Sequence, residues 1–309
     1  MGGDGGTRRI AVVLATVHRP ADIVRAIASA LESPYPDYEV LVVDQSGAPE
    51  TLAMEVKRRS DPRVRHLPMA RRGLSAALNH GAAHTDADLV AITGDDCTMR
   101  PDWLDAVARA FADPAIAVLF GSVASAPCDV AEAFVPGCRI DEPFIARALE
   151  DLHRMSGTTA CMAIRRRAWE ALGGFDETLG VGAVLRSGED VDLALRALHA
   201  GSLVIQTPDV AVTHHSPVAW SERATVVRRN WYGSGAVMAK WLKLAPLPML
   251  RALGRLAGRW VGGGSGVAAT YGTQPARGAM LVGFVTGFAV GLAWPVDRRR
   301  RLFRRPRSR

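Results

Sequence analysis

Residues 88–96 read DLVAITGDD, an apolar run that ends in a glycine and two adjacent carboxylates. Two similar runs precede it, IAVVLATV at 10–17 and EVLVVDQS at 39–46, and each ends in polar residues. The sequence around them favours helices at about 20–33, 49–60 and 73–84. Strands that alternate with helices predict an α/β fold with a mostly parallel sheet, whose ligand-binding groups lie at the carboxyl ends of the strands.

The best-known nucleotide-binding loops are missing from this pattern. The first run continues as ATVHRP, without the G-x-G-x-x-G of a dinucleotide site, and no GxxxxGK[ST] phosphate loop occurs. The glycine cluster GGGSG at 262–266 follows no strand. A phosphosugar nucleotidyltransferase would need a basic, glycine-rich loop after the first strand, and ATVHRP does not supply one. Dehydrogenase, P-loop and nucleotidyltransferase functions are therefore disfavoured.

Charge is distributed unevenly along the 309 residues. The net charge is +7, but residues 298–309 contain eight arginines and no acidic residue, which leaves 1–297 close to neutral. With 48% hydrophobic residues the chain is globular in composition. A neutral body argues against nucleic acid as a partner.

Polar side chains at the ends of the predicted strands suit a nucleoside diphosphate. Asp95 and Asp96 would repel each other unless a cation lies beside them, and a divalent ion that binds a diphosphate is a suitable partner. Asp44 can accept a hydrogen bond from a base that presents a ring N–H. Arg71 or Arg72, before the helix at 73–84, could meet a phosphate. Each feature also has a structural alternative, as an exposed turn, a helix cap or a solvated loop.

Two further segments carry candidate chemistry. The glycine-rich stretch 173–190 ends in Glu189 and Asp190 at the start of a predicted helix, where the helix dipole would keep Asp190 ionised and able to accept a proton. Helix capping is the alternative role for both. His214 ends a strand-like run and could complete a metal site, or could be structural.

The C-terminal region suggests contact with a membrane. Residues 278–296 carry no charge over 19 positions, about 28 Å of helix, which is close to the thickness of a bilayer core. Arg251 and Arg255 recur on one face of a preceding amphipathic helix. A span from a cytosolic body would place the arginine tail on the wrong side, so we expect a segment that lies in the interface or re-enters it. Ordinary packing on the body is the alternative, because glycines recur along the segment.

The two ends of the chain and its cysteines indicate the compartment. The first nine residues, MGGDGGTRR, do not resemble a signal peptide. Four cysteines without a CxxC pair indicate neither a disulfide framework nor a cysteine-based metal site. We expect a cytoplasmic protein, associated with the inner face of the cell membrane.

Seven segments taken in order resemble the inverting family 2 glycosyltransferases of the GT-A fold. They are VVLATVHRP, LVVDQSG, RRGLSAALNHG, ITGDDCTMRPDW, GTTACMAIRRRAWEALGGFDETLG, SGEDVDLALRALHAG and VAVTHHSP. The resemblance covers about residues 8 to 240 and implies a Rossmann-like, mostly parallel sheet. We therefore expect a GT-A catalytic domain over 8–240 and a C-terminal helical, membrane-associating extension over 241–309.

The resemblance also implies roles for particular residues. Asp96 would bind Mg²⁺ or Mn²⁺, and Gly94 replaces the first acid of the family's fuller pattern, which raises interest in His214 as a second ligand. Asp190 would be the catalytic base, with Glu189 beside it. Segment 156–170 and loop 180–188 would border the acceptor and the donor sugar. The residues expected to contact the nucleotide sugar are Thr16, His18, Arg19, Asp44, Arg72, Gly73, Asn79 and Asp95.

The expected reaction is transfer of a sugar from a UDP-, dTDP- or GDP-sugar to a hydroxyl group with inversion. A lipid-linked or cell-envelope acceptor follows from the C-terminal segments, and a soluble natural-product acceptor is the alternative. An inactive homologue that binds nucleotide sugars without turnover is a second alternative, prompted by Gly94.

Overall fold

The computed structural model describes residues 7–47, 54, 61–70, 73–261 and 276–304. Most of the helix expected at 49–60 lies outside these ranges. Arg72 and the last five residues of the arginine tail also lie outside them.

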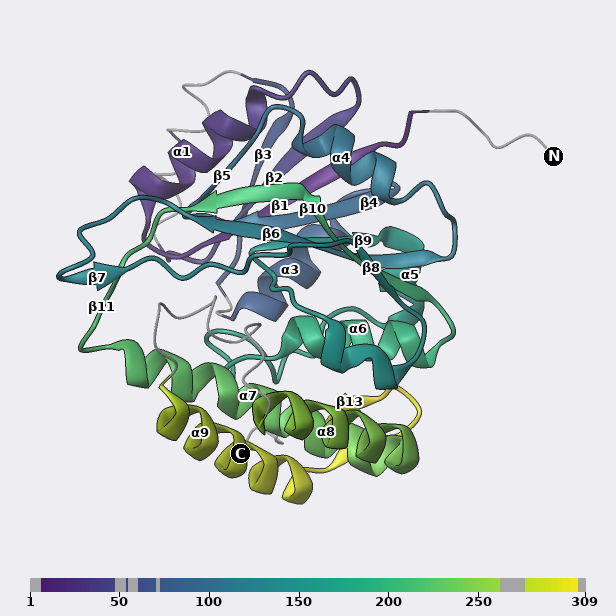
Figure 1. Ribbon diagram of the computed structural model, residues 1–309. Coiled ribbons are helices and arrows are strands. Elements are labelled where there is room, and N and C mark those ends of the chain that lie inside the picture. Colours follow the sequence, from purple (N-terminus) through teal and green to yellow (C-terminus); the bar gives the residue numbers. More distant parts are fainter. Residues whose placement is uncertain (1–6, 48–53, 55–60, 71–72, 262–275, 305–309) are drawn as a thin grey trace.

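A nine-stranded sheet forms the centre of the molecule (Figure 1). Its strand order is β3-β2-β1-β4-β9-β6-β10-β5, with β8 also paired to β10. Six strands run in one direction, and β5, β8 and β9 run against them, so the sheet is mixed but mostly parallel, as predicted. The strands are β1 (Ile10–Thr16), β2 (Tyr38–Asp44), β3 (Val64–Pro68), β4 (Leu89–Gly94), β5 (Cys97–Met99), β6 (Ile116–Ser125), β8 (Phe144–Ala146), β9 (Cys161–Arg165) and β10 (Leu203–His214).

Helices cover both faces of this sheet (Figure 1). Alternate residues of β1 point to opposite sides: Val12 packs with α1 (Pro20–Leu31) and α4 (Trp103–Ala110), and Val13 packs with α3 (Leu74–Ala83) and α6 (Glu189–His199). A Cβ atom at Gly81 of α3 would lie 2.6 Å from a Val13 methyl group. The small residues of α3 thus let it approach the sheet closely, as its sequence indicates.

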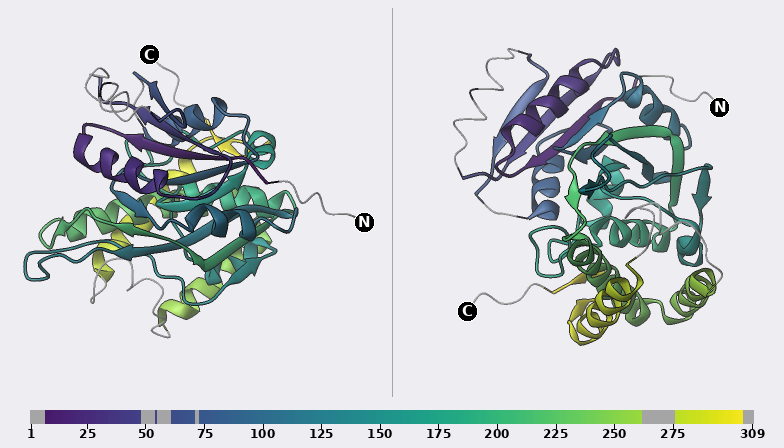
Figure 2. Two further views of the ribbon diagram at one scale, coloured as in Figure 1. Left: turned by 90° about the horizontal axis from the view of Figure 1, so that it is seen from above. Right: turned by 60° about the vertical axis from the view of Figure 1, so that its left-hand side comes forward.

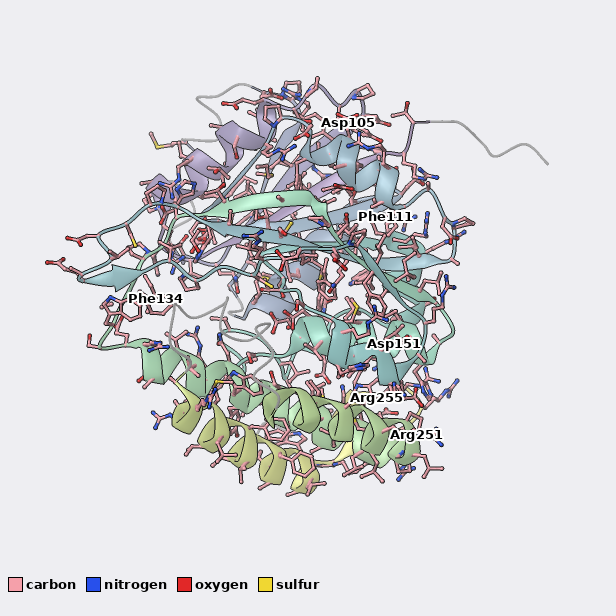
Figure 3. The ribbon with its side chains drawn as sticks, viewed as in Figure 1. Asp105, Phe111, Phe134, Asp151, Arg251 and Arg255 are labelled. Carbon is pink, nitrogen blue, oxygen red and sulfur yellow. The ribbon has the colours of Figure 1, made fainter. Side chains whose placement is uncertain are left out.

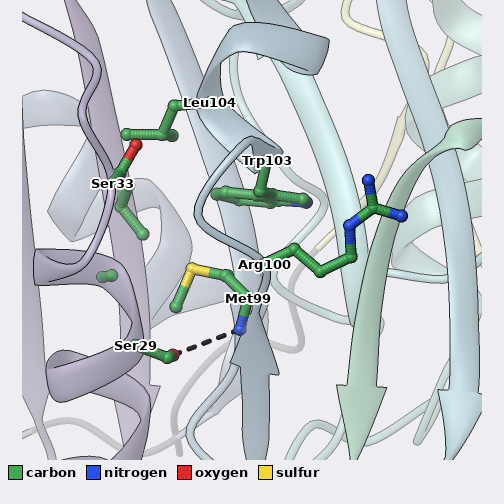
Figure 4. A pocket seen from close by; sticks show the side chains of 8 residues that line it. Ser29, Ser33, Met99, Arg100, Trp103 and Leu104 are labelled. Carbon is green, nitrogen blue, oxygen red and sulfur yellow. Dashed lines mark hydrogen bonds between the residues drawn. The ribbon is translucent and has the colours of Figure 1, made fainter.

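A small pocket lies between α1, β5 and α4 (Figure 4). Its walls are mainly apolar, and the Ser29 hydroxyl accepts a hydrogen bond from the Met99 backbone N–H at 3.1 Å. None of the residues expected to bind substrate lines it. The contact joins α1 to β5 and is part of the scaffold.

The C-terminal helices form a further layer beneath α6, on the side away from α1 and α4 (Figure 1). They are α7 (Arg223–Leu244), α8 (Pro246–Val261) and α9 (Arg277–Ala293), followed by the hairpin β12 (Val296–Asp297) and β13 (Leu302–Phe303). The smaller elements are α5 (Arg166–Leu172), the 3₁₀ helix η1 (Leu149–Arg154), β7 (Ala133–Phe134) and β11 (Val218–Ala219). The boundary expected at residue 240 falls inside α7, so the two expected regions share a helix.

Glycines allow α9 to pack closely against α7, and two views place these helices side by side (Figures 1 and 2). A Cβ atom at Gly283, Gly287 or Gly291 would lie 2.4, 1.8 or 2.6 Å from a backbone oxygen of α7. One face of the uncharged segment 278–296 is therefore an ordinary helix-packing surface. Within the described ranges, no helix combines the length and apolarity needed to cross a bilayer.

Arg251 and Arg255 of α8 lie near η1 (Figure 3). Arg251 approaches the Glu150 carboxylate at 3.4 Å, and the Arg255 guanidinium donates a hydrogen bond to the Glu150 backbone oxygen at 3.4 Å. Both side chains remain exposed, and that of Arg251 is 65% exposed. These contacts attach α8 to the body, and the expected contact of the two arginines with an anionic membrane stays a prediction.

The α7–α9 contact can be tested with two alanine substitutions in one helix. Gly287→Ala places a methyl group against the Tyr232 backbone oxygen, and we expect the free energy of unfolding to fall by about 1–3 kcal/mol. Gly278 has open space around it, so in Gly278→Ala the free energy of unfolding should stay nearly the same or rise by up to about 1 kcal/mol. Urea denaturation of both variants measures the difference, and equal effects would contradict the close packing.

Candidate active site

The loops after β1 and β4 bring one group of expected residues together. The Thr16 hydroxyl donates a hydrogen bond to Asp95 at 2.7 Å, and the Arg19 guanidinium reaches both Asp95, at 3.3 Å, and Asp96, at 2.7 Å. Parallel pairing of β1 with β4 places these residues together, because the two strands end at the same edge of the sheet. His18 lies exposed between them along the chain, in a left-handed conformation with φ of 54°.

His214 joins this group through the sheet. Residue 214 pairs with Cys97 across β10 and β5, so its ring lies beside Asp96, with Nε2 3.3 Å from Oδ2. Nδ1 lies 2.8 Å from the backbone oxygen of Pro136 and must donate, since a carbonyl oxygen only accepts. This hydrogen bond presents Nε2 to the carboxylate, which is the arrangement that a metal-binding histidine uses.

Electrostatics favour the charged forms of this pair. Burial alone would raise the pKa of Asp96, but His214, Ser216 and Arg19 together lower it. Burial lowers the pKa of His214, and the Asp96 carboxylate more than reverses that effect. Asp95 differs, because burial raises its pKa in spite of the hydrogen bond from Thr16.

The donor set fits a divalent cation in part. Asp96 and His214 direct an oxygen and a nitrogen toward one another, with Asp95 adjacent, while Arg19 occupies the same carboxylates. In the described part of the chain, no group of three or more histidine, cysteine or acidic side chains is preassembled as a metal site. Water or substrate oxygens would have to supply the other ligands, as they commonly do for Mg²⁺.

Asp44 forms a separate, fully engaged site at the end of β2. Its carboxylate accepts hydrogen bonds from the Ser46 N–H at 2.9 Å and from the Ser46 hydroxyl, and it lies 3.1 Å from His66 Nε2. Burial raises the pKa of Asp44, but the hydrogen bonds from Ser46 and His66 lower it overall. Sequence reasoning missed Ser46 and His66, because His66 reaches Asp44 only through the pairing of β2 with β3.

The catalytic pair expected from the sequence lies at the start of α6. Oδ2 of Asp190 accepts a hydrogen bond from the Thr159 N–H at 3.2 Å, and Oδ1 accepts one from the Val191 N–H at 2.7 Å. The Thr159 hydroxyl donates to Glu189 at 2.8 Å. The other Glu189 oxygen, Oε2, is buried and has no hydrogen-bond partner among the described residues. Thr159 lies within the segment 156–170 that the resemblance assigned to the acceptor side.

Burial changes the expected protonation of this pair. Burial, together with repulsion from Asp190, raises the pKa of Glu189. Burial also raises the pKa of Asp190, against the backbone hydrogen bonds from Val191 and Thr159. We expected the helix dipole to favour the ionised form of Asp190, and burial acts against that effect. The raised pKa of both groups favours a pair that can share a proton.

Residues 136–138 lie beside His214. The Pro136 backbone oxygen accepts a hydrogen bond from His214 Nδ1. Burial raises the pKa of the Cys138 thiol, two residues later, and the charge of Asp190 raises it further.

Two expected contacts with the donor have different outcomes. Gly73 caps α3 with φ of 127°, and the Leu74 N–H donates to the Val181 oxygen at 2.9 Å, so the start of α3 borders loop 180–188. The side-chain amide of Asn79 is engaged within the protein. Its amide donates to Phe175 O and Glu177, and it accepts from the Phe175 N–H and Trp169 Nε1.

Comparisons with known proteins identify the family. The model of the family described as glycosyl transferase family 2 matches residues 11–173. The O-antigen biosynthesis protein RfbC of Myxococcus xanthus is 30% identical over 77% of this chain and 20% of the relative. The pre-mycofactocin glycosyltransferase of Mycobacterium tuberculosis is 28% identical over 75% of this chain. The chain spans about a fifth and about half of the lengths of these two relatives.

Two solved structures share the fold. The mannosyltransferase PcManGT from Pyrobaculum calidifontis, in complex with GDP-Man and Mn²⁺, superposes with a TM-score of 0.61 at 22% identity, over 94% of this chain and 88% of that one. S. aureus TarS residues 1–349 gives a TM-score of 0.62 at 14% identity, over 92% and 81% of the two chains. The family model covers more than half of the sequence, and the chain therefore belongs to glycosyl transferase family 2, with an α/β GT-A-like fold.

Proposed function

We propose that the protein transfers a sugar from a nucleotide-diphosphate sugar to an acceptor hydroxyl, with inversion at the anomeric carbon. The observation that carries this proposal is the position of Asp190. It is half-buried at the start of α6, beside Glu189, and backbone N–H groups hold both of its carboxylate oxygens. Membership of the family supports the reaction class.

In this proposal Asp190 accepts the proton of the attacking hydroxyl. The N–H groups of Val191 and Thr159 fix its two oxygens, so the carboxylate is oriented before the acceptor arrives. Its raised pKa makes it a stronger base than an exposed aspartate. Glu189 lies beside it and can share its proton.

Asp96 and His214 would hold Mg²⁺ or Mn²⁺ in this proposal, with Asp95 toward the ribose or the ion. When bound, the ion supplies positive charge that neutralises the departing diphosphate. Thr16, His18, Arg19, Asp44 and Gly73 are the remaining described candidates for binding the nucleotide sugar. The solved relative that contains GDP-Man and Mn²⁺ supports a metal-dependent donor, and UDP, dTDP and GDP remain the candidate nucleotides.

Two acceptor classes follow from the relatives. One relative is named for O-antigen biosynthesis, which favours a lipid-linked or cell-envelope acceptor. Another is named a pre-mycofactocin glycosyltransferase, which favours a soluble, small acceptor as the second candidate. We prefer the first class because of the outer surface of α9.

That surface suits peripheral contact with the cytoplasmic face of a membrane. Leu281 and Val285 are each 55% exposed, on the side of α9 that faces away from α7, and Arg298, Arg299 and Arg300 are exposed in the adjoining hairpin. Apolar side chains flanked by arginines match an anionic bilayer surface. The catalytic region 8–240 and the extension 241–309 would then act together at that surface.

Substitution of the base tests the reaction. Asp190→Asn should lower kcat by about 10²- to 10⁴-fold, because the amide cannot accept the proton, while nucleotide affinity stays unchanged. Turnover with a panel of UDP-, dTDP- and GDP-sugars measures it, and Asp209→Asn, at an exposed position on β10, is the control. An unchanged rate in Asp190→Asn would refute the assignment of the base, and nucleotide binding without any turnover in the wild type would favour the inactive homologue.

Two adjacent histidines provide a matched test of the metal site. His214→Ala should reduce the Mn²⁺-dependent part of nucleoside diphosphate affinity about 10- to 100-fold. His215→Ala should retain that affinity, because His215 contacts the Thr98 hydroxyl at 2.8 Å instead. Calorimetric titration of GDP and UDP with Mn²⁺ and with chelator measures both, and equal losses in the two variants would refute the assignment.

Vesicle binding tests the outer surface of α9. The full chain should sediment with vesicles that contain anionic phosphatidylglycerol, and the double substitution Leu281→Gln with Val285→Gln should reduce that binding several-fold. Val130→Gln, at a valine that is 76% exposed outside α9, is the control. Equal binding of all three proteins would remove the membrane argument and leave the soluble acceptor.

A further inference from the structure

The segment that leads into the proposed base is tightly packed against α7. The Ser187 hydroxyl donates to the Asn230 backbone oxygen at 2.7 Å. A Cβ atom at Gly233 would lie only 2.2 Å from the Ser187 backbone oxygen, so no larger residue fits there. Residues 229–233 of α7 therefore pack beside the turn that precedes Glu189 and Asp190.

Arg186 stands at the start of this turn in an unusual conformation. Its φ is 69°, in the left-handed region that residues other than glycine rarely adopt, which suggests that its side chain has a role. The guanidinium lies over the Tyr232 ring, with Cζ 5.1 Å from the ring centre. Stacking uses the flat face of the guanidinium and leaves the N–H groups at its edge available to an oxygen ligand.

Arg229, in this part of α7, is the second arginine near the turn. It is partly buried, and its Nε donates to the Asn230 side chain at 3.3 Å. Burial raises the pKa of Glu189, and the charge of Arg229 acts against that rise, so the two side chains share one electrostatic environment. Among the ion pairs of the described chain, neither Arg186 nor Arg229 has a carboxylate partner. Arg186 and Arg229 thus lie near the proposed base, and neither forms a short ion pair within the described chain.

We propose that Arg186 and Arg229 bind a phosphate or diphosphate group carried by the acceptor. The inference rests on the proposed function, because in a single inverting displacement the base and the attacking hydroxyl lie opposite the departing nucleotide. Cationic groups beside the base therefore face the acceptor and not the donor diphosphate. Guanidinium groups bind phosphate oxygens through paired N–H donors, which suits this ligand.

The proposal predicts a substrate class. The acceptor hydroxyl belongs to a molecule whose phosphate lies close to the reacting end, either a lipid phosphate or a soluble sugar phosphate. In both cases the anion would be held while Asp190 removes the hydroxyl proton.

The test uses the full chain saturated with Mn²⁺ and GDP or UDP, titrated with octyl phosphate and, separately, with glucose 1-phosphate. The wild type should bind at least one probe, and Arg186→Gly and Arg229→Gln should each weaken that binding about tenfold or more. Glycine tolerates the left-handed backbone at 186, so this variant removes the guanidinium and keeps the turn. Preference for octyl phosphate would indicate a lipid-linked source, and preference for glucose 1-phosphate a soluble one.

Two matched variants serve as controls. Arg228→Gln removes a charge from the same helix as Arg229. Arg301→Gly replaces an arginine of the C-terminal hairpin whose backbone is left-handed, with φ of 56°. Both should bind the probes as the wild type does. If no probe binds the wild type, or if Arg186→Gly and Arg229→Gln weaken GDP or UDP and not the probes, the proposal is wrong. Failure of the proposed function would appear separately, because the wild type would then show no Mn²⁺-dependent nucleotide binding.

Discussion

The Lys240 ammonium group lies between two buried carboxylates with no exposure to solvent. It is 2.5 Å from Asp192 and 3.1 Å from Asp176, and it donates to the Arg301 backbone oxygen at 3.0 Å. Removal of one partner from such a cluster leaves an uncompensated buried charge, at a cost of about 3–5 kcal/mol. Because Asp192 lies two residues after Asp190, the position of α6 and of the proposed base depends on this cluster.

The same cluster fixes both ends of the glycine-rich loop. Asp176 precedes loop 180–188 and Asp192 follows it, so one lysine holds the two sides of a segment that contains several left-handed glycines. Asp192 also accepts from Arg196 at 2.9 Å, and Asp176 accepts from the Phe303 N–H at 2.7 Å. Residues of the C-terminal hairpin therefore help to hold loop 180–188. The expected extension 241–309 thus contributes contacts that position a loop of the expected catalytic region.

Local sequence patterns were sufficient to predict β1, β2 and β4 and the carboxylates at the ends of β2 and β4. The runs at 10–17, 39–46 and 88–96 correspond to β1, β2 and β4 within about two residues, because buried parallel strands have continuous apolar sequences. β3 has the sequence VRHLP and carries no such signal, so the contact of His66 with Asp44 was not foreseen. The partners of Asn79 were not foreseen for a related reason, because they lie about 95 residues later and meet it only in the folded chain.

The uncharged segment 278–296 shows why composition alone could not decide between a membrane and a protein environment. Its glycines at 283, 287 and 291 recur every four residues and so form one stripe, which fits against the backbone of α7. Other faces of the helix carry Leu281, Val282, Val285 and Leu292, which remain exposed. A hydropathy average adds the glycine stripe and these residues together, although the stripe faces protein and the residues face outward. The arginines that follow are also partly ordered, since Asp297 accepts the N–H groups of Arg299 and Arg300 at 3.0 Å. The hairpin thereby places positive charge beside the exposed residues of α9 while its other strand reaches the buried lysine. Contact of those residues with a surface would consequently act on the same structural unit that holds loop 180–188.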